Sequence, residues 1–125
     1  MKSKQTLDSL GALRGRYGIE VDAKYWESRE VPGGVGLPDE VVASLALAAR
    51  RYDDRSAVAY EMESSNKEFA PLTVSLDQEG FDTLRRSMLS HFDLVLVPPS
   101  KKWALVLSHE LDGILLGPEH FLAKL

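Results

Sequence analysis

The chain has 125 residues, a length that suits a single domain spanning 1–125. Hydrophobic residues make up 44% and charged residues 27%, as in ordinary globular proteins, so disorder and fibrous repeats are excluded. The net charge of −4 and the scattered basic residues argue against nucleic acid as a partner, and the absence of cysteine excludes disulfides and thiolate metal sites.

The N-terminus lacks the apolar stretch of a signal peptide, and no apolar run approaches the ~20 residues that cross a bilayer. These features predict a cytoplasmic protein that makes no contact with a membrane. A reducing compartment also agrees with the lack of cysteine.

The first third of the chain predicts a helix and a long connection. Residues 1–18 form the predicted N-terminal helix, which Gly18 ends in a left-handed conformation. Its apolar face comprises Leu7, Leu10, Leu13 and Tyr17. Residues 19–37 contain several glycines and little periodicity, so they are predicted to be a loop-rich connection with room for a short edge strand at 19–21.

Three further helices are expected. Pro38 suits the first turn of a helix whose apolar residues continue at core-facing spacing to Ala49. Asp77 is a plausible N-cap for a helix at about 78–90, because the residues around it form a hydrophobic staple. Pro118 opens a short helix at the end of the chain.

Alternating and continuous apolar runs predict the strands. Val58, Tyr60 and Met62 are expected to face the core, and Glu61 lies on the other, partly wet face of the same strand. The other predicted strands are 69–76, in which Pro71 suits an edge position, and 92–97, 103–109 and 114–116.

The order of these elements defines the expected fold class. Strands follow one another as hairpins and do not alternate with helices, which favours an antiparallel sheet over a doubly wound parallel one. We therefore predict a single α+β domain with an antiparallel sheet of about five strands and helices packed mainly on one face.

The residue types that carry chemistry are poorly placed. His109 and His120 are separated by a turn and a strand, a spacing that does not match a zinc motif, so no metal is expected. The glycines of 32–36 lack a following lysine and run into Asp39 and Glu40, which argues against a phosphate loop or another cofactor. No catalytic nucleophile is evident.

Acidic residues gather around the first predicted hairpin. We expect them to form a surface that attracts a basic partner, although an ordinary solvated sheet face explains the same pattern. The candidate partner-binding residues are Asp53, Asp54, Glu61, Glu63 and Glu68.

The last third resembles the ending of small bacterial immunity proteins from polymorphic toxin systems. The resemblance rests on the runs 92–97, 103–110 and 112–117, which include a strand with a tryptophan and a His-Glu turn, and on the closing Phe121. It implies a non-enzymatic protein that binds and blocks a cognate toxin, which fits a basic toxin domain as the partner.

Two alternatives remain open. The chain is a small enzyme or ligand-binding domain if Tyr25, Trp26 and Trp103 wall a pocket beside His109 or His120. It is a homo-oligomeric scaffold if the apolar hairpins or the first helix pair between copies. The sequence does not define the oligomeric state.

Overall fold

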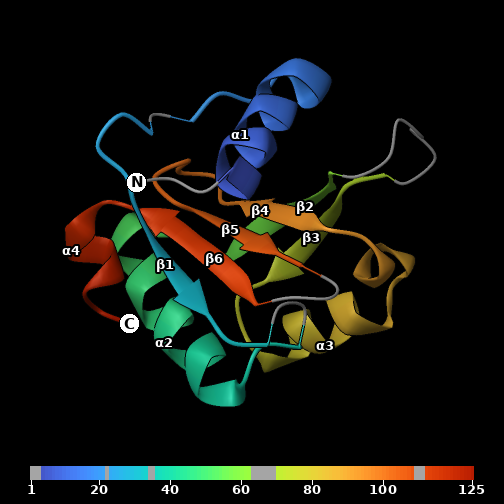
Figure 1. Ribbon diagram of the computed structural model, residues 1–125. Coiled ribbons are helices and arrows are strands. Elements are labelled where there is room, and N and C mark those ends of the chain that lie inside the picture. The colour runs from blue at the N-terminus through green and yellow to red at the C-terminus, as the bar shows by residue number, and fades with distance from the viewer. Residues whose placement is uncertain (1–3, 22, 34–35, 63–69, 109–111) are drawn as a thin grey trace.

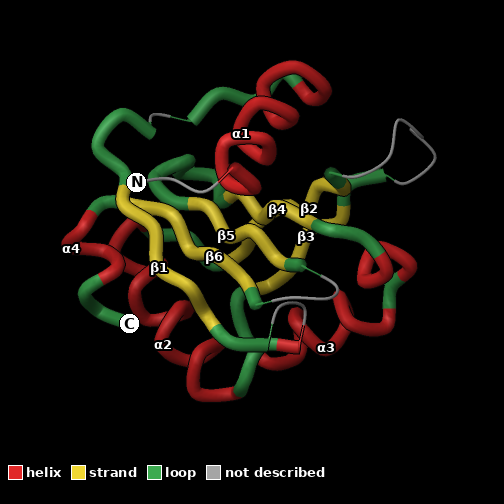
Figure 2. The backbone as a smooth tube through the Cα atoms, in the orientation of Figure 1, coloured by secondary structure: helices red, strands yellow, loops and turns green. Residues whose placement is uncertain are grey.

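The computed structural model describes residues 4–21, 23–33, 36–62, 70–108 and 112–125. Its helices are α1 (Lys4–Tyr17), α2 (Asp39–Ala49), α3 (Gln78–Arg86) and α4 (Glu119–Leu122), with 3-10 turns η2 (Arg50–Tyr52) and η3 (Met88–His91). Its strands are β1 (Glu27–Val31), β2 (Ser56–Glu61), β3 (Leu72–Ser75), β4 (Leu94–Val97), β5 (Ala104–Leu107) and β6 (Gly113–Gly117). Figure 2 shows these elements along the backbone.

The six strands form one sheet in the order β1-β6-β5-β4-β2-β3, and every neighbouring pair is antiparallel. The predicted α+β class with an antiparallel sheet is therefore confirmed, with six strands in place of about five. The additional strand is β1, which lies inside the predicted loop-rich connection 19–37. Its Glu-Ser-Arg-Glu sequence carries no apolar alternation, because these four residues are exposed at the sheet edge and only Val31 is buried.

Helices cover both faces of the sheet. One core cluster joins Leu45 of α2, Leu84 of α3 and Phe121 of α4 to the strands, and a second cluster contains Leu13 of α1. In Figure 1, α1 lies on one side of the sheet, and α2, α3 and α4 lie on the other. The expectation of helices mainly on one face therefore omitted the layer that α1 adds.

Strand β2 has the opposite orientation to the one its sequence suggested. Ala57 and Ala59 are fully buried against the larger core, whereas Val58 and Tyr60 are half-buried on the α1 side. The small alanine side chains let the helices of the larger core approach the sheet closely. A strand covered on both faces has no wet face, so the rule of polar out and apolar in did not apply.

Helix α3 begins as predicted and ends earlier. The carboxylate Oδ1 of Asp77 accepts hydrogen bonds from the backbone N–H of Gly80 and from the hydroxyl of Ser75, each at 2.8 Å. The hydroxyl of Ser87 donates to the carbonyl of Leu84 at 2.6 Å, and this local bond accompanies an extended Ser87 backbone. The predicted helix at 78–90 therefore divides into α3 and η3.

Candidate functional site

Asp54 is a buried carboxylate that joins two surface segments. Asp54 comes shortly after η2 in the chain and is only 2% exposed. Oδ2 accepts hydrogen bonds from the indole Nε1 of Trp103 at 3.0 Å and from the hydroxyl of Ser100 at 2.6 Å, and Oδ1 accepts one from the backbone N–H of Ser100 at 3.1 Å. Three donors thus satisfy the charge, and the turn between β4 and β5 is fastened to the end of α2.

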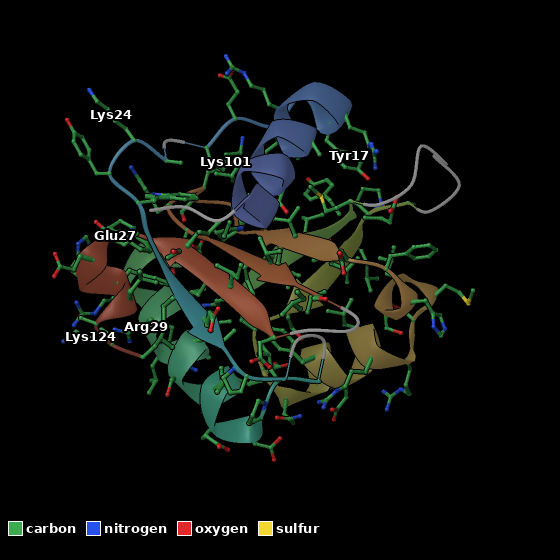
Figure 3. The ribbon with its side chains drawn as sticks, viewed as in Figure 1. Tyr17, Lys24, Glu27, Arg29, Lys101 and Lys124 are labelled. Atoms are coloured by element: carbon green, nitrogen blue, oxygen red, sulfur yellow. The ribbon has the colours of Figure 1, made fainter. Side chains whose placement is uncertain are left out.

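Exposed cations flank this buried acid in the chain and follow Ser100 on the turn that it holds. They come from η2, from the position just before β2 and from the β4–β5 turn, and all are exposed. We call this set the basic patch; it comprises Arg50, Arg51, Arg55, Lys101 and Lys102. Figure 3 shows Lys101 on its turn. No member of the patch forms an ion pair with another residue that the structure describes.

An apolar groove runs from the basic patch along α2. Helices α2 and α3 lie next to each other on the same face of the sheet (Figure 1), and the groove follows α2 past the start of α3. It has a volume of about 370 Å³ and continues into a smaller hollow of about 190 Å³ beside Asp54. We call it the α2–α3 groove; it is lined by Asp39, Val42, Ala43, Ala46, Arg50, Leu76, Asp77 and Gln78.

After the acidic first turn of Asp39 and Glu40, the outer face of α2 beside this groove is also apolar. Ala43 is exposed and Leu47, one helical turn later, is 65% exposed. A helix on the surface of a globular protein normally carries polar residues on its outer side. The apolar surface of α2 therefore continues from the floor of the groove to its outer rim.

The predicted acidic surface does not assemble from its five residues. Asp53 is exposed, but Asp54 points into the protein, and Glu61 is 2% exposed with Arg16 Nη1 3.6 Å from its carboxylate. Glu63 and Glu68 lie outside the described residues. The exposed charge around Asp53 and Asp54 is therefore mainly basic. Asp54, a predicted surface acid, is buried, and the β4–β5 turn adds the exposed Lys101 and Lys102.

The predicted aromatic pocket does not form either. Trp26 belongs to the cluster under α1, whereas Trp103 is fully buried in the larger core on the opposite face. Tyr25 is 78% exposed, with the ammonium of Lys24 5.3 Å from its ring centre. His109 lies outside the described residues. A sheet separates the two tryptophans, so they cannot wall one site.

His120 contacts Tyr52 on the protein surface. The hydroxyl of Tyr52 and Nε2 of His120 share a hydrogen bond of 2.8 Å, and the Tyr52 ring stacks on Phe121, which stacks on Trp103. Burial raises the pKa of the Tyr52 hydroxyl, with an opposing effect from Arg51 and a further increase from Asp54. Tyr52 and His120 thus extend the stack of Trp103 and Phe121 from the core to the protein surface beside α4.

A separate hollow of about 370 Å³ lies between α1 and the segment that follows it. Leu10, Ile19 and Val21 provide its apolar lining, and an exposed ion pair between Arg14 and Glu20 stands at its border, with 3.3 Å between Nε and Oε1. This hollow contains none of the residues predicted for the ligand pocket.

Within the described residues, no three histidine, aspartate or glutamate side chains gather as metal ligands would. No helix among them combines the length and the apolar composition needed to cross a bilayer.

No protein-family model matches the chain, and neither the curated proteins nor the solved structures contain a significant match to it. The resemblance of the last third to immunity proteins therefore stays a prediction.

Sequence reasoning did not identify the basic patch or the α2–α3 groove. One signal was present: the α2 sequence DEVVASLALAA is apolar almost all round. A helix of that kind is either buried or covered by something else, and α2 of the described structure is buried on one side only.

Proposed function

We propose that this chain is a non-enzymatic, cytoplasmic binding protein, and in its most concrete form an immunity protein that neutralises a cognate toxin. The observation that carries the proposal is the apolar surface of α2, which extends from the α2–α3 groove to the exposed Leu47. Exposed apolar surface of this kind, bordered by charged residues, is typical of a protein–protein contact.

The toxin form of the proposal draws support from the resemblance of the last third. In the described structure that third includes Phe121 and Trp103, which stack behind the surface that Asp54 and the basic patch share. The expected basic partner loses support because Asp54 and Glu61 are buried. We therefore assign the contact to the α2–α3 groove in place of the acidic hairpin.

The proposal is tested by a matched pair of surface variants. Leu47→Asp places a charge on the outer face of α2, and Met88→Asp, at a residue 62% exposed on η3, does the same away from the groove. We expect the wild-type chain and Met88→Asp to retain one stoichiometric protein partner from cells of the source organism, and to protect those cells from a toxin encoded beside the gene. Leu47→Asp should lose both properties.

Equal behaviour of the two variants would contradict the assignment of the contact to α2. Circular dichroism of both variants separates loss of binding from loss of folding.

A small-ligand function is the second candidate, and the hollow beside α1 is the observation that favours it. Its volume of about 370 Å³ falls within the range of ligand pockets, and its lining is partly apolar. Ala23→Trp would fill part of this hollow. A metabolite pool that raises the melting temperature of the wild-type chain, but not of Ala23→Trp, would support this candidate over the first.

A further inference from the structure

We infer that the α2–α3 groove binds an acidic, amphipathic segment of the partner protein, in which an apolar side chain enters the groove and nearby carboxylates pair with Arg50 and Arg55. The inference rests on the proposed binding function and specifies the chemistry of the segment that binds.

The arginines of the groove are available for a partner, and its acids are largely compensated. Arg50 and Arg55 are exposed, line the groove or its continuation, and make no ion pair with a described residue. Asp39 lies in the first turn of α2 and Asp77 caps α3, where the positive end of each helix offsets the carboxylate. The third acid at the groove, Asp54, points inward to three hydrogen-bond donors.

The remaining cations of the basic patch strengthen this assignment. Arg51 follows α2 in η2, and Lys101 and Lys102 follow Ser100 on the turn that Asp54 holds against the same end of α2. A chain with a net charge of −4 thus presents a local cationic surface at one end of an apolar groove. Such a surface attracts carboxylates and steers their approach.

The spacing along α2 defines the segment further. Ala43 and Ala46 form the apolar wall, and Arg50 follows them by seven and four residues. At the helical rise of about 1.5 Å per residue, the backbone of Arg50 lies about 6–10 Å along the helix axis from the two alanines of the wall. The segment therefore carries its acidic residues within about one to two helical turns of its apolar anchor.

A protein segment fits this surface better than nucleic acid or a membrane does. Nucleic-acid sites combine a cationic track with exposed aromatic rings for stacking, whereas the apolar lining of the groove consists of alanine, valine and leucine and contains no aromatic ring. The overall negative charge also opposes a long polyanion or an anionic lipid surface. An apolar side chain with flanking carboxylates matches both parts of the site.

The test selects binding segments from a library of random sequences. Phage that display random 16-residue peptides are panned against the purified full chain, and the most enriched peptide is synthesised. Its Kd is then measured by fluorescence anisotropy for the wild type, Arg50→Glu, Arg55→Glu, Leu47→Asp and the control Arg86→Glu, which changes an exposed arginine of α3 outside the groove. Circular dichroism shows whether a loss of binding reflects unfolding. Arg50→Gln removes the positive charge without reversing it, and so separates lost attraction from new repulsion.

We expect enriched peptides to contain aspartate or glutamate close to a large apolar residue. Arg50→Glu or Arg55→Glu should weaken binding about tenfold, with a smaller loss for Arg50→Gln and less than about a twofold change for Arg86→Glu. Raising the salt concentration should also weaken peptide binding by the wild type, because salt screens the attraction between the arginines and the carboxylates.

Enrichment of basic or neutral peptides that still require Leu47 would overturn the acidic segment and leave the proposed binding function intact. A failure to enrich any peptide, or peptides indifferent to Leu47 and to both arginines, would count against the two proposals together. Tighter, arginine-dependent binding to a single-stranded oligonucleotide or to phosphatidylserine vesicles would overturn the choice of a protein segment.

Discussion

The two faces of the sheet are closed in different ways. On one face, α2 buries Leu45, Ala48 and Ala49 in a cluster that also contains α3 and α4. On the other face, α1 contributes the fully buried Leu13, but a hollow of about 370 Å³ remains beside its middle. The α2–α3 groove on the first face has the same volume, so the difference lies in the cores: among the described residues, 21 buried residues form the cluster under α2, α3 and α4, and seven form the cluster under α1.

Polar contacts compensate for part of this difference at the end of α1. The hydroxyl of Tyr17 donates to the backbone carbonyl of Glu61 at 2.7 Å, and Arg16 lies 3.6 Å from the carboxylate of the same residue. These contacts fix the direction of α1 across the sheet more than they add apolar burial. The larger core therefore supplies most of the stability, and α1 covers the other face and is fixed to the sheet at its C-terminal end.

Removing one leucine from each face tests the difference between the two cores directly. Leu45→Ala on α2 should lower the free energy of unfolding by about 3–4 kcal/mol, because its well-packed surroundings cannot collapse into the cavity. Leu13→Ala on α1 should cost about 2 kcal/mol, since fewer buried residues surround it in the smaller cluster. Urea unfolding followed by circular dichroism measures both values. Equal losses would show that α1 packs as tightly as α2.

Two glycines, one on α3 and one on α1, test the effect of adding a methyl group. A Cβ at Gly80 of α3 would lie 1.9 Å from the carbonyl oxygen of Ser75, so Gly80→Ala should cost about 3 kcal/mol by forcing the backbone apart. A Cβ at Gly11 of α1 meets no atom within 4 Å, and Gly11→Ala should stabilise the chain by about 0.5–1 kcal/mol through helix propensity. Melting temperatures that shift in the same direction would contradict the difference in space at the two glycines.

Removing the buried carboxylate of Asp54 tests the hydrogen bonds that join the β4–β5 turn and Trp103 to the end of α2. Asp54→Ala leaves the Trp103 indole and the Ser100 N–H without their acceptor, so we expect a loss of about 2 kcal/mol. Ser100→Ala removes one donor and should cost less. A double-mutant cycle in unfolding free energy checks that the two effects couple; full additivity would argue against the hydrogen-bonded link.

The smallest expected effect is a pH dependence on the α1 face. Burial raises the pKa of the Tyr60 hydroxyl, and Tyr17, whose ring centre is 4.7 Å away, raises it further. An unfolded tyrosine loses its proton near its ordinary value of about 10, before the folded one does. The contribution of Tyr60 to stability is therefore complete below about pH 10 and declines as the pH rises above it.

Unfolding free energies at about pH 8 and about pH 10.5 measure this decline. Tyr60→Phe should make the decline shallower, and Tyr25→Phe, at a residue 78% exposed, should leave it unchanged. An identical slope in the wild type and in Tyr60→Phe would exclude Tyr60 as its source.

Local sequence signals are sufficient where one rule acts alone. Asp77 is identifiable as a cap because its carboxylate, the staple residues and the following apolar stripe all indicate the same helix start. The apolar runs at 92–97 and 103–109 predict two central strands, because a continuous apolar run bounded by turn residues is typical of a strand buried on both faces. The predicted antiparallel sheet follows from the order of these elements along the chain.

Local signals fail where a residue's partner is distant in sequence. The sequence indicates a surface acid at Asp54, because no local pattern shows that Ser100 and Trp103 would surround it. Strand β1 escapes prediction because its pairing with β6 depends on backbone hydrogen bonds and leaves its side chains exposed. The candidate site depends on both kinds of long-range contact.

By itself, the sequence determined the α+β class, the approximate location of α1 to α4 and the antiparallel character of the sheet, because capping, periodicity and turn residues act over a few positions. Only the tertiary structure decided which face of β2 is buried, that Asp54 turns inward, and that the Lys101 turn joins the end of α2. Those outcomes depend on which donors, acceptors and apolar faces become neighbours after folding, and distance along the chain does not encode them.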